Sequence, residues 1–354
     1  MRPKPSSPTT VATESNGRAA SIAMEFDDNG LAQQLFGSHH SHLTLIEDRL
    51  GVQIHARGNT LILAGAGDGP MLAKRALTQL YARLERGLGV EPADVDAALR
   101  FASVPSEAGD AKTIRTRNRH ISARTPTQAE YLRAIDENAL VFGQGPAGTG
   151  KTYLAVAKAV ERLVNGEVDR IILSRPAVEA GEQLGFLPGN MREKVDPYLR
   201  PLYDALYDML PAPQVVKRLE SGEIEVAPLA FMRGRTLTNA FAILDEAQNT
   251  TAVQMKMFLT RLGENSRMVV TGDLSQVDLP RGIRSGLRDA LEVLDKTKGV
   301  AFVRFTDQDV VRHPLVAKIV NAYGQVERQR RRSAPYETDA EATPPGAIDG
   351  VDDQ

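Results

Sequence analysis

The sequence predicts an α/β protein in which a single core with a parallel sheet follows a small α+β domain. Three apolar runs predict the core, because each reads as a buried strand that leads into glycine or polar residues. They are Ala139–Phe142, followed by Gly145–Thr152; Ala240–Leu244, followed by Asp245-Glu246; and Met268–Val270, followed by Thr271-Gly272-Asp273. Ligands of open α/β sheets bind at the carboxyl ends of the strands, so we expect the functional residues there.

The composition sets the limits of the functional interpretation. The chain has 354 residues, enough for two domains with cores of their own. Its net charge of −2 neither favours nor excludes nucleic acid as a partner, and the absence of cysteine excludes disulfides and thiolate metal sites. No apolar stretch approaches the length of a membrane span, and residues 1–21 lack the apolar core of a secretory signal. We therefore expect a cytoplasmic protein.

The N-terminal region is divided into a tail and a compact domain. Residues 1–24 are rich in Pro, Ser and Thr, which predicts a disordered tail. Residues 25–88 predict an α+β domain. Its expected elements are a helix with Leu31, Leu35 and Phe36 on one face, a break at 37–40, a helix with Leu43, Ile46 and Leu50 that Gly51 ends, strands at 52–55 and 61–63 joined by a turn at 57–59, and a helix marked by Leu77, Leu80, Tyr81 and Leu84.

The order helix, short loop, helix, hairpin and helix resembles a KH domain, which binds single-stranded nucleic acid. The GXXG loop of that domain clamps the nucleic-acid backbone. At the corresponding position this chain has Gly37-Ser38-His39-His40, without the second glycine. His39, His40 and His42 offer contacts to phosphates or bases instead. The alternative is an accessory module that binds a partner protein or mediates assembly.

Residues 89–124 connect the two domains, and the second half of this segment is basic. Ile114 and Ile121 alternate with charged neighbours, as in extended structure. No acidic residue lies between Asp110 and Glu130. The segment is either a solvated basic strand or a ribbon that contacts phosphates, and the sequence leaves both interpretations open. Its basic residues are Lys112, Arg115, Arg117, Arg119, His120 and Arg124.

The predicted core, residues 125–329, contains a phosphate-binding loop of the pattern G-x-x-x-x-G-K-[ST]. The loop is Gly145, Pro146, Ala147, Gly148, Thr149, Gly150, Lys151 and Thr152. Its glycines let the backbone N–H groups turn towards phosphate oxygens, and the helix that follows adds partial positive charge. Lys151 can reach the β- and γ-phosphates of ATP, and the Thr152 hydroxyl can bind Mg²⁺. Upstream, Gln128 lies some twenty residues before the loop and just ahead of a predicted helix, a position that resembles that of the adenine-reading Gln of superfamily 1 helicases. The resemblance implies a contact with the adenine edge, to which a Gln amide can both donate and accept.

Further site residues follow the second and third buried strands. Asp245 is placed to hold Mg²⁺, directly or through water, and Glu246 to orient and polarise the attacking water. The number of residues between the phosphate loop and this carboxylate pair fits a core in which one further strand lies between them in the sequence. Gln276 is expected to sense the γ-phosphate or position water. Arg312 is a candidate arginine finger, with a surface salt bridge as the alternative. Residues 330–354 predict a second disordered tail.

Several stretches together resemble known ATPases. The phosphate loop, Leu244–Gln248 and Thr271–Gln276 look like motifs I, II and III of superfamily 1 helicases, but only one RecA-like unit fits here. The closer resemblance is to the PhoH-like family, of which Ser174–Glu182, Gly185–Gly189 and Ile243–Asn249 are typical. The similarity covers roughly residues 25–330. It implies a cytoplasmic protein with a single RecA-like P-loop NTPase core behind a KH-like domain.

The same resemblance implies the function. It indicates a Mg²⁺-dependent ATPase that acts on RNA, with helicase-like remodelling, a ring-shaped homo-oligomer and pairing with a YbeY-type endoribonuclease. Because a lone core has no second lobe to close on ATP, we expect a neighbouring subunit to cover the site. Arg175, Arg284 or Arg312 would then act across the interface. The alternative is a nucleotide-gated scaffold that regulates a partner ribonuclease with little or no unwinding.

Overall fold

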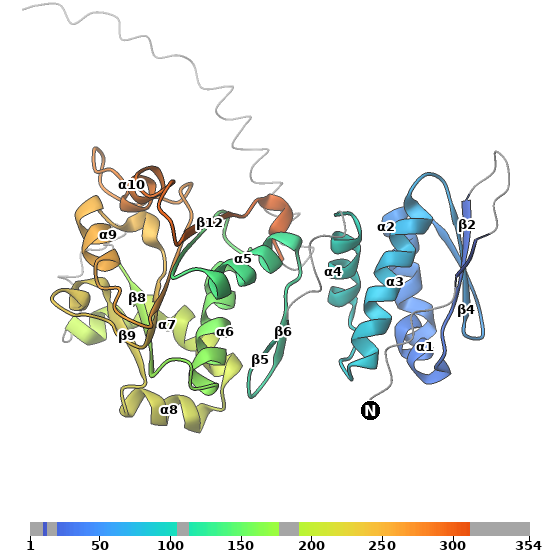
Figure 1. Ribbon diagram of the computed structural model, residues 1–354, viewed down its shortest axis with the longest axis horizontal. Coiled ribbons are helices and arrows are strands. Elements are labelled where there is room, and N and C mark those ends of the chain that lie inside the picture. The colour runs from blue at the N-terminus through green and yellow to red at the C-terminus, as the bar shows by residue number, and fades with distance from the viewer. Residues whose placement is uncertain (1–9, 13–19, 105–112, 177–190, 312–354) are drawn as a thin grey trace, which may run out of the picture. The chain divides into compact units, whose positions relative to one another are not determined.

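The computed structural model describes residues 10–12, 20–104, 113–176 and 191–311 (Figure 1). Within these ranges, an antiparallel sheet with helices forms the N-terminal part, and a larger parallel sheet organises the core. No helix in these ranges combines the length and the apolar composition that crossing a bilayer requires.

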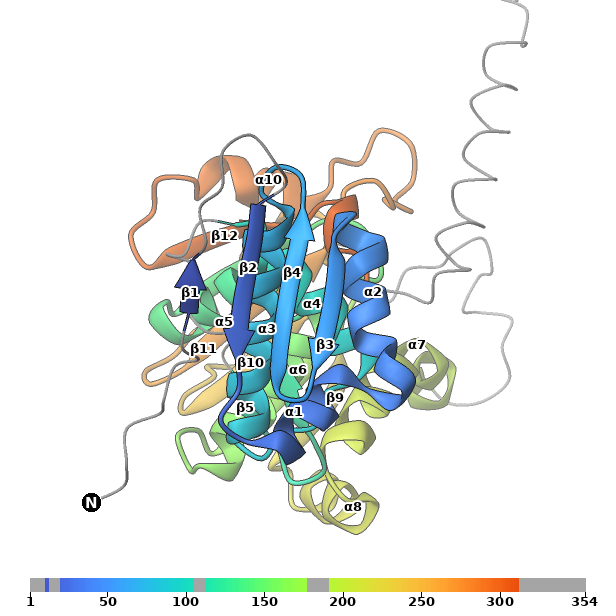
Figure 2. The ribbon, with the colours of Figure 1, turned by 90° about the vertical axis from the view of Figure 1, so that its right-hand side faces the viewer.

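A four-stranded antiparallel sheet of order β1-β2-β4-β3 organises the N-terminal part (Figure 2). Its elements are β1 (Thr10–Ala12), β2 (Ala20–Glu25), α1 (Asn29–Phe36), η1 (Ser38–His40), α2 (Ser41–Leu50), β3 (Gln53–Arg57), β4 (Thr60–Gly65) and α3 (Gly69–Glu85). The expected order of two helices, a hairpin and a helix is present. The prediction of a disordered tail over 1–24 is wrong where β1 and β2 lie. Strand β2 pairs with β4, far along the chain, and Met24 is buried opposite Leu61.

Of the three histidines expected to contact nucleic acid in or next to the loop at 37–40, two are exposed and one is buried. Gly37, His39 and His40 all have positive φ (76°, 51° and 60°), and the two histidines are exposed. His42 is buried instead, with its Nδ1 3.0 Å from the carbonyl oxygen of Leu35. His42 therefore packs under the loop and is not available to a ligand. The resemblance to a KH domain stays a prediction.

The segment 89–124 contains more regular structure than a linker. Helix α4 (Pro92–Ala102) begins with a capping box formed by Glu91 and Asp94. Strands β5 (Thr113–Arg115) and β6 (His120–Ser122) form an antiparallel hairpin. Ile114 lies opposite Ile121, and both are buried. The alternation in the sequence therefore correctly predicts extended structure with one buried side.

Six parallel strands in the order β12-β7-β11-β10-β8-β9 form the core sheet. The elements of the core are α5 (Pro126–Glu137), β7 (Leu140–Gln144), α6 (Lys151–Val164), β8 (Arg170–Arg175), α7 (Met191–Met209), α8 (Ala212–Glu220), β9 (Ile224–Pro228), η3 (Leu229–Met232), β10 (Ala240–Leu244), η4 (Ala247–Asn249), α9 (Ala252–Leu259), β11 (Arg267–Gly272), α10 (Gly286–Val293), β12 (Val300–Arg304) and η5 (Asp307–Asp309). This is a single RecA-like core, with β11 between the strand of the phosphate loop and the strand of the carboxylates.

Strand β9 is an addition that the sequence did not predict. Between β7 and β10 the chain forms two strands, β8 and β9, where we expected one. Strand β9 lies at the edge of the sheet, contains Glu225 and ends in Pro228. Proline and a charged residue are typical of edge strands and weaken the local pattern of a buried strand.

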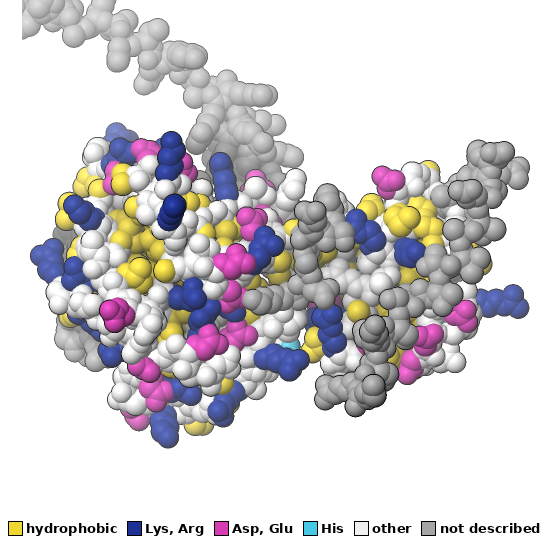
Figure 3. All heavy atoms as spheres, viewed as in Figure 1, with side chains coloured by type: hydrophobic (Ala, Val, Ile, Leu, Met, Phe, Trp, Pro, Cys, Tyr) yellow, Lys and Arg dark blue, Asp and Glu magenta, His cyan; other side chains and the backbone are white. Residues whose placement is uncertain are grey.

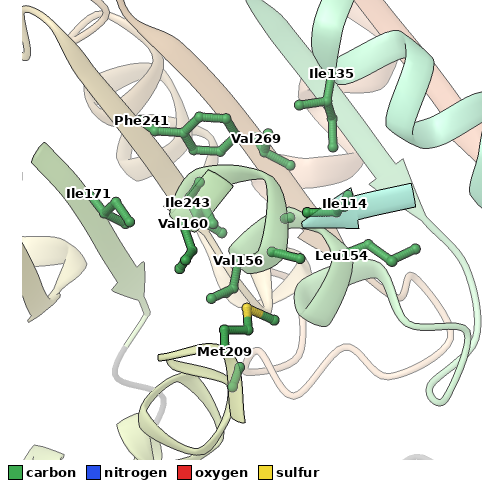
Figure 4. Packing of buried hydrophobic residues seen from close by; sticks show 14 of the residues in the cluster. Ile114, Ile135, Leu154, Val156, Val160, Ile171, Met209, Phe241, Ile243 and Val269 are labelled. Atoms are coloured by element: carbon green, nitrogen blue, oxygen red, sulfur yellow. The ribbon is translucent and has the colours of Figure 1, made fainter. Parts of the chain in front are cut away.

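Helices cover both faces of the core sheet, which explains why its strands are apolar without alternation. In β10, Phe241 and Ile243 pack on the face covered by α6, against Val156 and Val160 (Figure 4). Leu244 belongs to the apolar cluster on the other face, together with residues of α9 and α10. Packing on both faces fixes the sheet and therefore the positions of the residues at its carboxyl edge.

Candidate active site

The carboxyl ends of three neighbouring strands surround a cavity of ≈ 240 Å³. Strand β7 leads into the phosphate loop, β10 into Asp245-Glu246, and β11 into Asp273. Parallel pairing thus brings together segments that are distant in sequence. The residues that line the cavity are Ala147, Gly148, Gly150, Lys151, Thr152, Tyr153, Asp245, Glu246, Gly272, Asp273 and Gln276.

Glycines give the phosphate loop its shape. Gly145 has a φ of 143°, and a Cβ at this position would lie 2.4 Å from the carbonyl oxygen of Phe305. Gly150 has a φ of 82° and directly precedes α6. Helix α6 begins at Lys151, so its unpaired N–H groups and its partial positive charge lie at the loop. The combination forms a binding site for an anion.

The ammonium group of Lys151 lies within this loop. Its Nζ donates to the carbonyl oxygens of Gly145 and Pro146 at 2.7 and 2.8 Å. The residue is only 8% exposed, and a buried cation needs such partners. In this structure the positive charge of Lys151 is held by the carbonyl groups of the loop and lies in the wall of the cavity.

Two hydroxyl groups meet the carboxylate of Asp245. The Thr152 hydroxyl donates to Oδ1 at 2.6 Å, and the Thr271 hydroxyl donates to the same oxygen at 2.7 Å. A hydroxyl and a carboxylate in contact beside a phosphate loop match the oxygen donors that Mg²⁺ takes from proteins, which commonly supply one or two carboxylates while phosphates and waters complete the shell. The residues present thus fit a magnesium ion held by Thr152 and Asp245.

Glu246 has an unusual backbone and two polar partners. Its φ of 51° is in the left-handed region, which is uncommon for a residue with a side chain. One carboxylate oxygen lies 3.2 Å from a guanidinium nitrogen of Arg175, and the other accepts a hydrogen bond from Gln248 at 2.5 Å. The same guanidinium donates to the carbonyl oxygen of Tyr198 in α7 at 2.9 Å. Strained residues cluster at functional sites, where the surrounding structure holds them in place.

The amide of Gln248 connects two walls of the cavity. Besides Glu246, its Nε2 donates to the carbonyl oxygen of Gln276 at 3.2 Å. Its Oε1 accepts from the backbone N–H of Asp273 at 3.0 Å. Gln248 is 1% exposed, so these bonds form away from water. The carboxylate after β10 and the loop after β11 are therefore joined by one side chain.

Asp273 is held as a carboxylate. Burial alone would raise the pKa of Asp273, but hydrogen bonds from the side chain and backbone of Ser275 and from Gln276 lower it, as does the charge of Lys151. The pKa of Asp273 consequently lies below its ordinary value. Gln276 donates to Oδ2 of Asp273 at 2.5 Å, which places this predicted residue in the cavity wall.

Comparison with known proteins identifies the family. The profile of the family described as PhoH-like protein matches residues 120–324 of this chain. The chain belongs to this family. A PhoH-like protein of Bacillus subtilis (strain 168) is 52% identical over 298 residues, which are 82% of this chain and 93% of that protein. Protein PhoH of Escherichia coli (strain K12) is 53% identical over 205 residues, which are 57% of this chain and 58% of that protein.

Two solved structures align with this PhoH-like chain at low TM-scores. A SWI2/SNF2 ATPase core of Sulfolobus solfataricus in complex with dsDNA aligns with a TM-score of 0.31 and 13% identity, over 60% of this chain and 54% of that chain. The Pif1 helicase of Candida albicans aligns with a TM-score of 0.27 and 14% identity, over 51% of this chain and 39% of that chain. The assignment as a nucleotide-binding P-loop ATPase therefore rests on the sheet order and the residues of the cavity.

Gln128 of the PhoH-like chain does not stand where the sequence placed it. The residue is 4% exposed and is not among the described residues that line the cavity. Its Oε1 accepts from the N–H of Arg124 at 2.7 Å, and its Nε2 donates to the carbonyl oxygen of Thr149 at 2.9 Å. Both ends of the amide are engaged with backbone, so in this structure Gln128 supports the phosphate loop and does not present a free edge to adenine.

Two residues of the site were not predicted, and one predicted residue lies outside the part of the chain that the structure describes. Arg312 falls outside the described residues, as do Gly185–Gly189. Gln248 and Thr271 were not given roles, although both belong to stretches that resemble helicase motifs, which was the available signal. The contact of Thr271 with Asp245, and that of Gln248 with the N–H of Asp273, depend on the pairing of β10 with β11.

Proposed function

We propose that this PhoH-like protein is a cytoplasmic, Mg²⁺-dependent ATPase that acts on single-stranded RNA. The observation that carries the proposal is that Lys151, the pair Thr152–Asp245 and Glu246 line one cavity. Phosphoryl transfer requires little more than positioning and charge stabilisation, and these residues supply both.

Each residue has a separate task in the proposed reaction. The loop N–H groups and Lys151 hold the phosphates, and Thr152 and Asp245 hold Mg²⁺. When bound, the ion neutralises negative charge on the phosphate oxygens. Glu246 accepts a hydrogen bond from the attacking water and orients it towards the γ-phosphate. Gln276, fixed by Asp273, contacts the same region of the cavity.

Two features support RNA as the substrate. The first is the family resemblance, which implies action on RNA. The second is the basic hairpin β5–β6, whose exposed cations suit a phosphate backbone. The KH-like resemblance of the N-terminal part adds a further candidate surface for a single strand.

The lone core favours assembly. Hydrolysis in a RecA-like core is completed when a second element closes over the nucleotide, and this chain carries one such core in its described part. We therefore propose a homo-oligomer, in ring form as the family implies, in which an arginine of the neighbouring subunit reaches the γ-phosphate. Arg284 and Arg312 are the candidates for that role. Arg284 is exposed and pairs with Glu292 of α10, and neither residue lines the cavity. Arg175, in contrast, is engaged with the cavity residue Glu246 of its own chain.

The test is ATP turnover by the full chain with and without single-stranded RNA. We expect RNA to raise the rate, Mg²⁺ removal with EDTA to abolish it, and Glu246→Gln to abolish it while ATP still binds. Equal rates with and without RNA would reject action on RNA, and no turnover under any condition would reject hydrolysis.

A nucleotide-gated scaffold is the second candidate. It is favoured by the ion pair of Glu246 with Arg175, since an engaged carboxylate suits slow hydrolysis. In this version the nucleotide state controls binding of a partner ribonuclease of the YbeY type. A pull-down with wild type, Lys151→Ala and Glu246→Gln tests it: partner binding that does not change with nucleotide state rejects the scaffold.

A further inference from the structure

The hairpin β5–β6 has one buried and one charged side. Ile114 and Ile121 anchor it in the core, where Ile114 lies beside Leu154 of α6 (Figure 4). Its other residues include Arg115, Arg117, Arg119 and His120, all of which are exposed. The hairpin is therefore anchored to the core by its apolar side and exposes cationic side chains to solvent on its other side.

Positive charge on this hairpin is almost uncompensated. Residues 113–124 contain no acidic residue. Among the described residues, Arg119 is the member of the hairpin that forms a salt bridge, with Asp208 of α7 at 2.9 Å. Figure 3 shows Lys and Arg side chains on several parts of the described surface, together with Asp and Glu side chains. Mutual repulsion of like charges is relieved by a polyanion.

An exposed aromatic residue lies on α7, the helix that contacts the tip of the hairpin. The tip of the hairpin is attached to the end of α7, because the N–H of Asn118 donates to the carbonyl oxygen of Met209 at 3.3 Å. In the same turn of α7, Tyr207 is 42% exposed. Cations beside an exposed ring are the combination with which proteins hold single strands, by phosphate contact and base stacking.

One carboxylate joins the hairpin to the nucleotide cavity. Oδ1 of Asp208 pairs with Arg119, and Oδ2 accepts a 2.6 Å hydrogen bond from the hydroxyl of Tyr153. Tyr153 lines the cavity and directly follows Thr152. If a phosphate binds Arg119 in place of Asp208, the carboxylate of Asp208 keeps, of these two contacts, only its hydrogen bond with Tyr153. That change strengthens the hydrogen bond and orders the cavity wall.

We propose that the β5–β6 hairpin binds the phosphate backbone of single-stranded RNA, and that Asp208 transmits its occupancy to the nucleotide cavity. The inference rests on the proposed action on RNA and names the surface and the coupling residue. Arg115 and Arg117 bind phosphates, Arg119 exchanges Asp208 for a phosphate, and Tyr207 stacks on a base. Because coupling is reciprocal, RNA tightens ATP binding and ATP tightens RNA binding by the same factor.

The binding surface is tested with a fluorescent oligo(U) and the full chain, by anisotropy over a range of salt concentrations. Arg115→Gln/Arg117→Gln should weaken binding and lower the slope of log K against log salt by about 1.4, since each phosphate contact with a single strand contributes about 0.7. The control Lys296→Gln/Lys298→Gln removes the same charge from an exposed loop before β12 and should leave the slope unchanged. An unchanged slope in the hairpin variant overturns the proposal.

The coupling is tested by the affinity for a non-hydrolysable ATP analogue with and without oligo(U). We expect RNA to tighten the analogue about 5-fold in wild type, at the lower end of common coupling. Asp208→Asn should abolish this change while oligo(U) still binds. Arg119→Gln, at a side chain 61% exposed, gives the same test without altering a partly buried residue. Full coupling in both variants overturns the role of Asp208.

These outcomes separate this inference from the proposed function. If wild type binds oligo(U) but hydrolyses no ATP, hydrolysis fails while the hairpin and the coupling are still decided by binding. If wild type hydrolyses ATP and binds RNA, but the hairpin variant does so equally well, the hairpin alone is rejected. If wild type binds no RNA, both proposals fall.

Discussion

The Thr152 hydroxyl donates a 2.6 Å hydrogen bond to Oδ1 of Asp245, a residue 93 positions later. This contact joins the phosphate loop to the strand that carries the carboxylates. We predict that Thr152→Ala raises the Mg²⁺ concentration needed for half-maximal ATP binding or turnover by about 10-fold or more, as loss of a metal-site partner does. Thr152→Ser keeps the hydroxyl and should restore the wild-type requirement. An unchanged Mg²⁺ dependence in Thr152→Ala would remove this residue from the metal site.

Glu246 is predicted to act in hydrolysis and not in binding. Glu246→Gln keeps the size and the hydrogen-bonding ability of the side chain but removes the base, so turnover should fall about 100-fold or more. The affinity for ATP, measured with a fluorescent analogue, should stay close to that of wild type. The control Glu130→Gln changes an exposed carboxylate of α5 and should have no effect. Normal turnover in Glu246→Gln would mean that another group orients the water.

Arg175 is predicted to position Glu246. Its guanidinium joins the carboxylate to the Tyr198 carbonyl of α7, and this fixes a side chain whose backbone is strained. Arg175→Gln should lower kcat about 10- to 100-fold with little change in KM, the pattern expected when a reacting group is misplaced by a fraction of an ångström to 1 Å. Arg170→Gln, at the exposed start of the same strand, is the control. If KM rises and kcat does not change, Arg175 contacts the substrate instead.

The sequence predicts the site residues that belong to short motifs, but not those whose contacts are made with distant parts of the chain. Lys151, Thr152, Asp245 and Glu246 were predicted because short motifs after buried strands specify both their chemistry and their place at the sheet edge. For Gln128, the sequence offers only its position ahead of a helix and the ability of its amide to donate and accept. Its actual partners are the backbone groups of Arg124 and Thr149, which no local pattern reveals.

The fold shows the same division. Strand β10 was predicted because an uninterrupted apolar run is typical of a strand buried on both faces. The composition of residues 1–24 predicts a disordered tail, but Ala20–Met24 belong to strand β2, whose sequence is Ala-Ser-Ile-Ala-Met-Glu. It is small and mixed in character, and its pairing with β4 stabilises it through contacts that lie far away in sequence. Long-range pairing, and not local propensity, decides such segments.

Gly145 is predicted to tolerate no side chain. With φ at 143° and the Phe305 carbonyl oxygen 2.4 Å from a would-be Cβ, Gly145→Ala forces the loop or the segment directly after β12 to move. We expect a loss of about 1–3 kcal/mol in the free energy of unfolding, together with weaker ATP binding. Gly89→Ala is the matched control, because a Cβ there meets nothing within 4 Å and φ is not positive. Equal urea-unfolding midpoints for the two variants would contradict the strain argument.

The Tyr153 hydroxyl gives a pH-dependent signature of its bond to Asp208. Burial, followed by the hydrogen bond and the charge of Asp208, raises the pKa of Tyr153 to about 12 from its ordinary value of 10.0. A pKa raised on folding stabilises the protein fully below the unfolded pKa, and this contribution is lost as the pH rises from about 10 to about 12. The difference in unfolding free energy between wild type and Tyr153→Phe should therefore be constant up to about pH 9 and shrink above about pH 10. Burial also raises the pKa of Tyr131, but both proteins keep that residue, so the difference isolates Tyr153. Urea unfolding at stepped pH measures it, and parallel curves for the two proteins up to the highest pH would show that the Tyr153 hydroxyl is not held by Asp208.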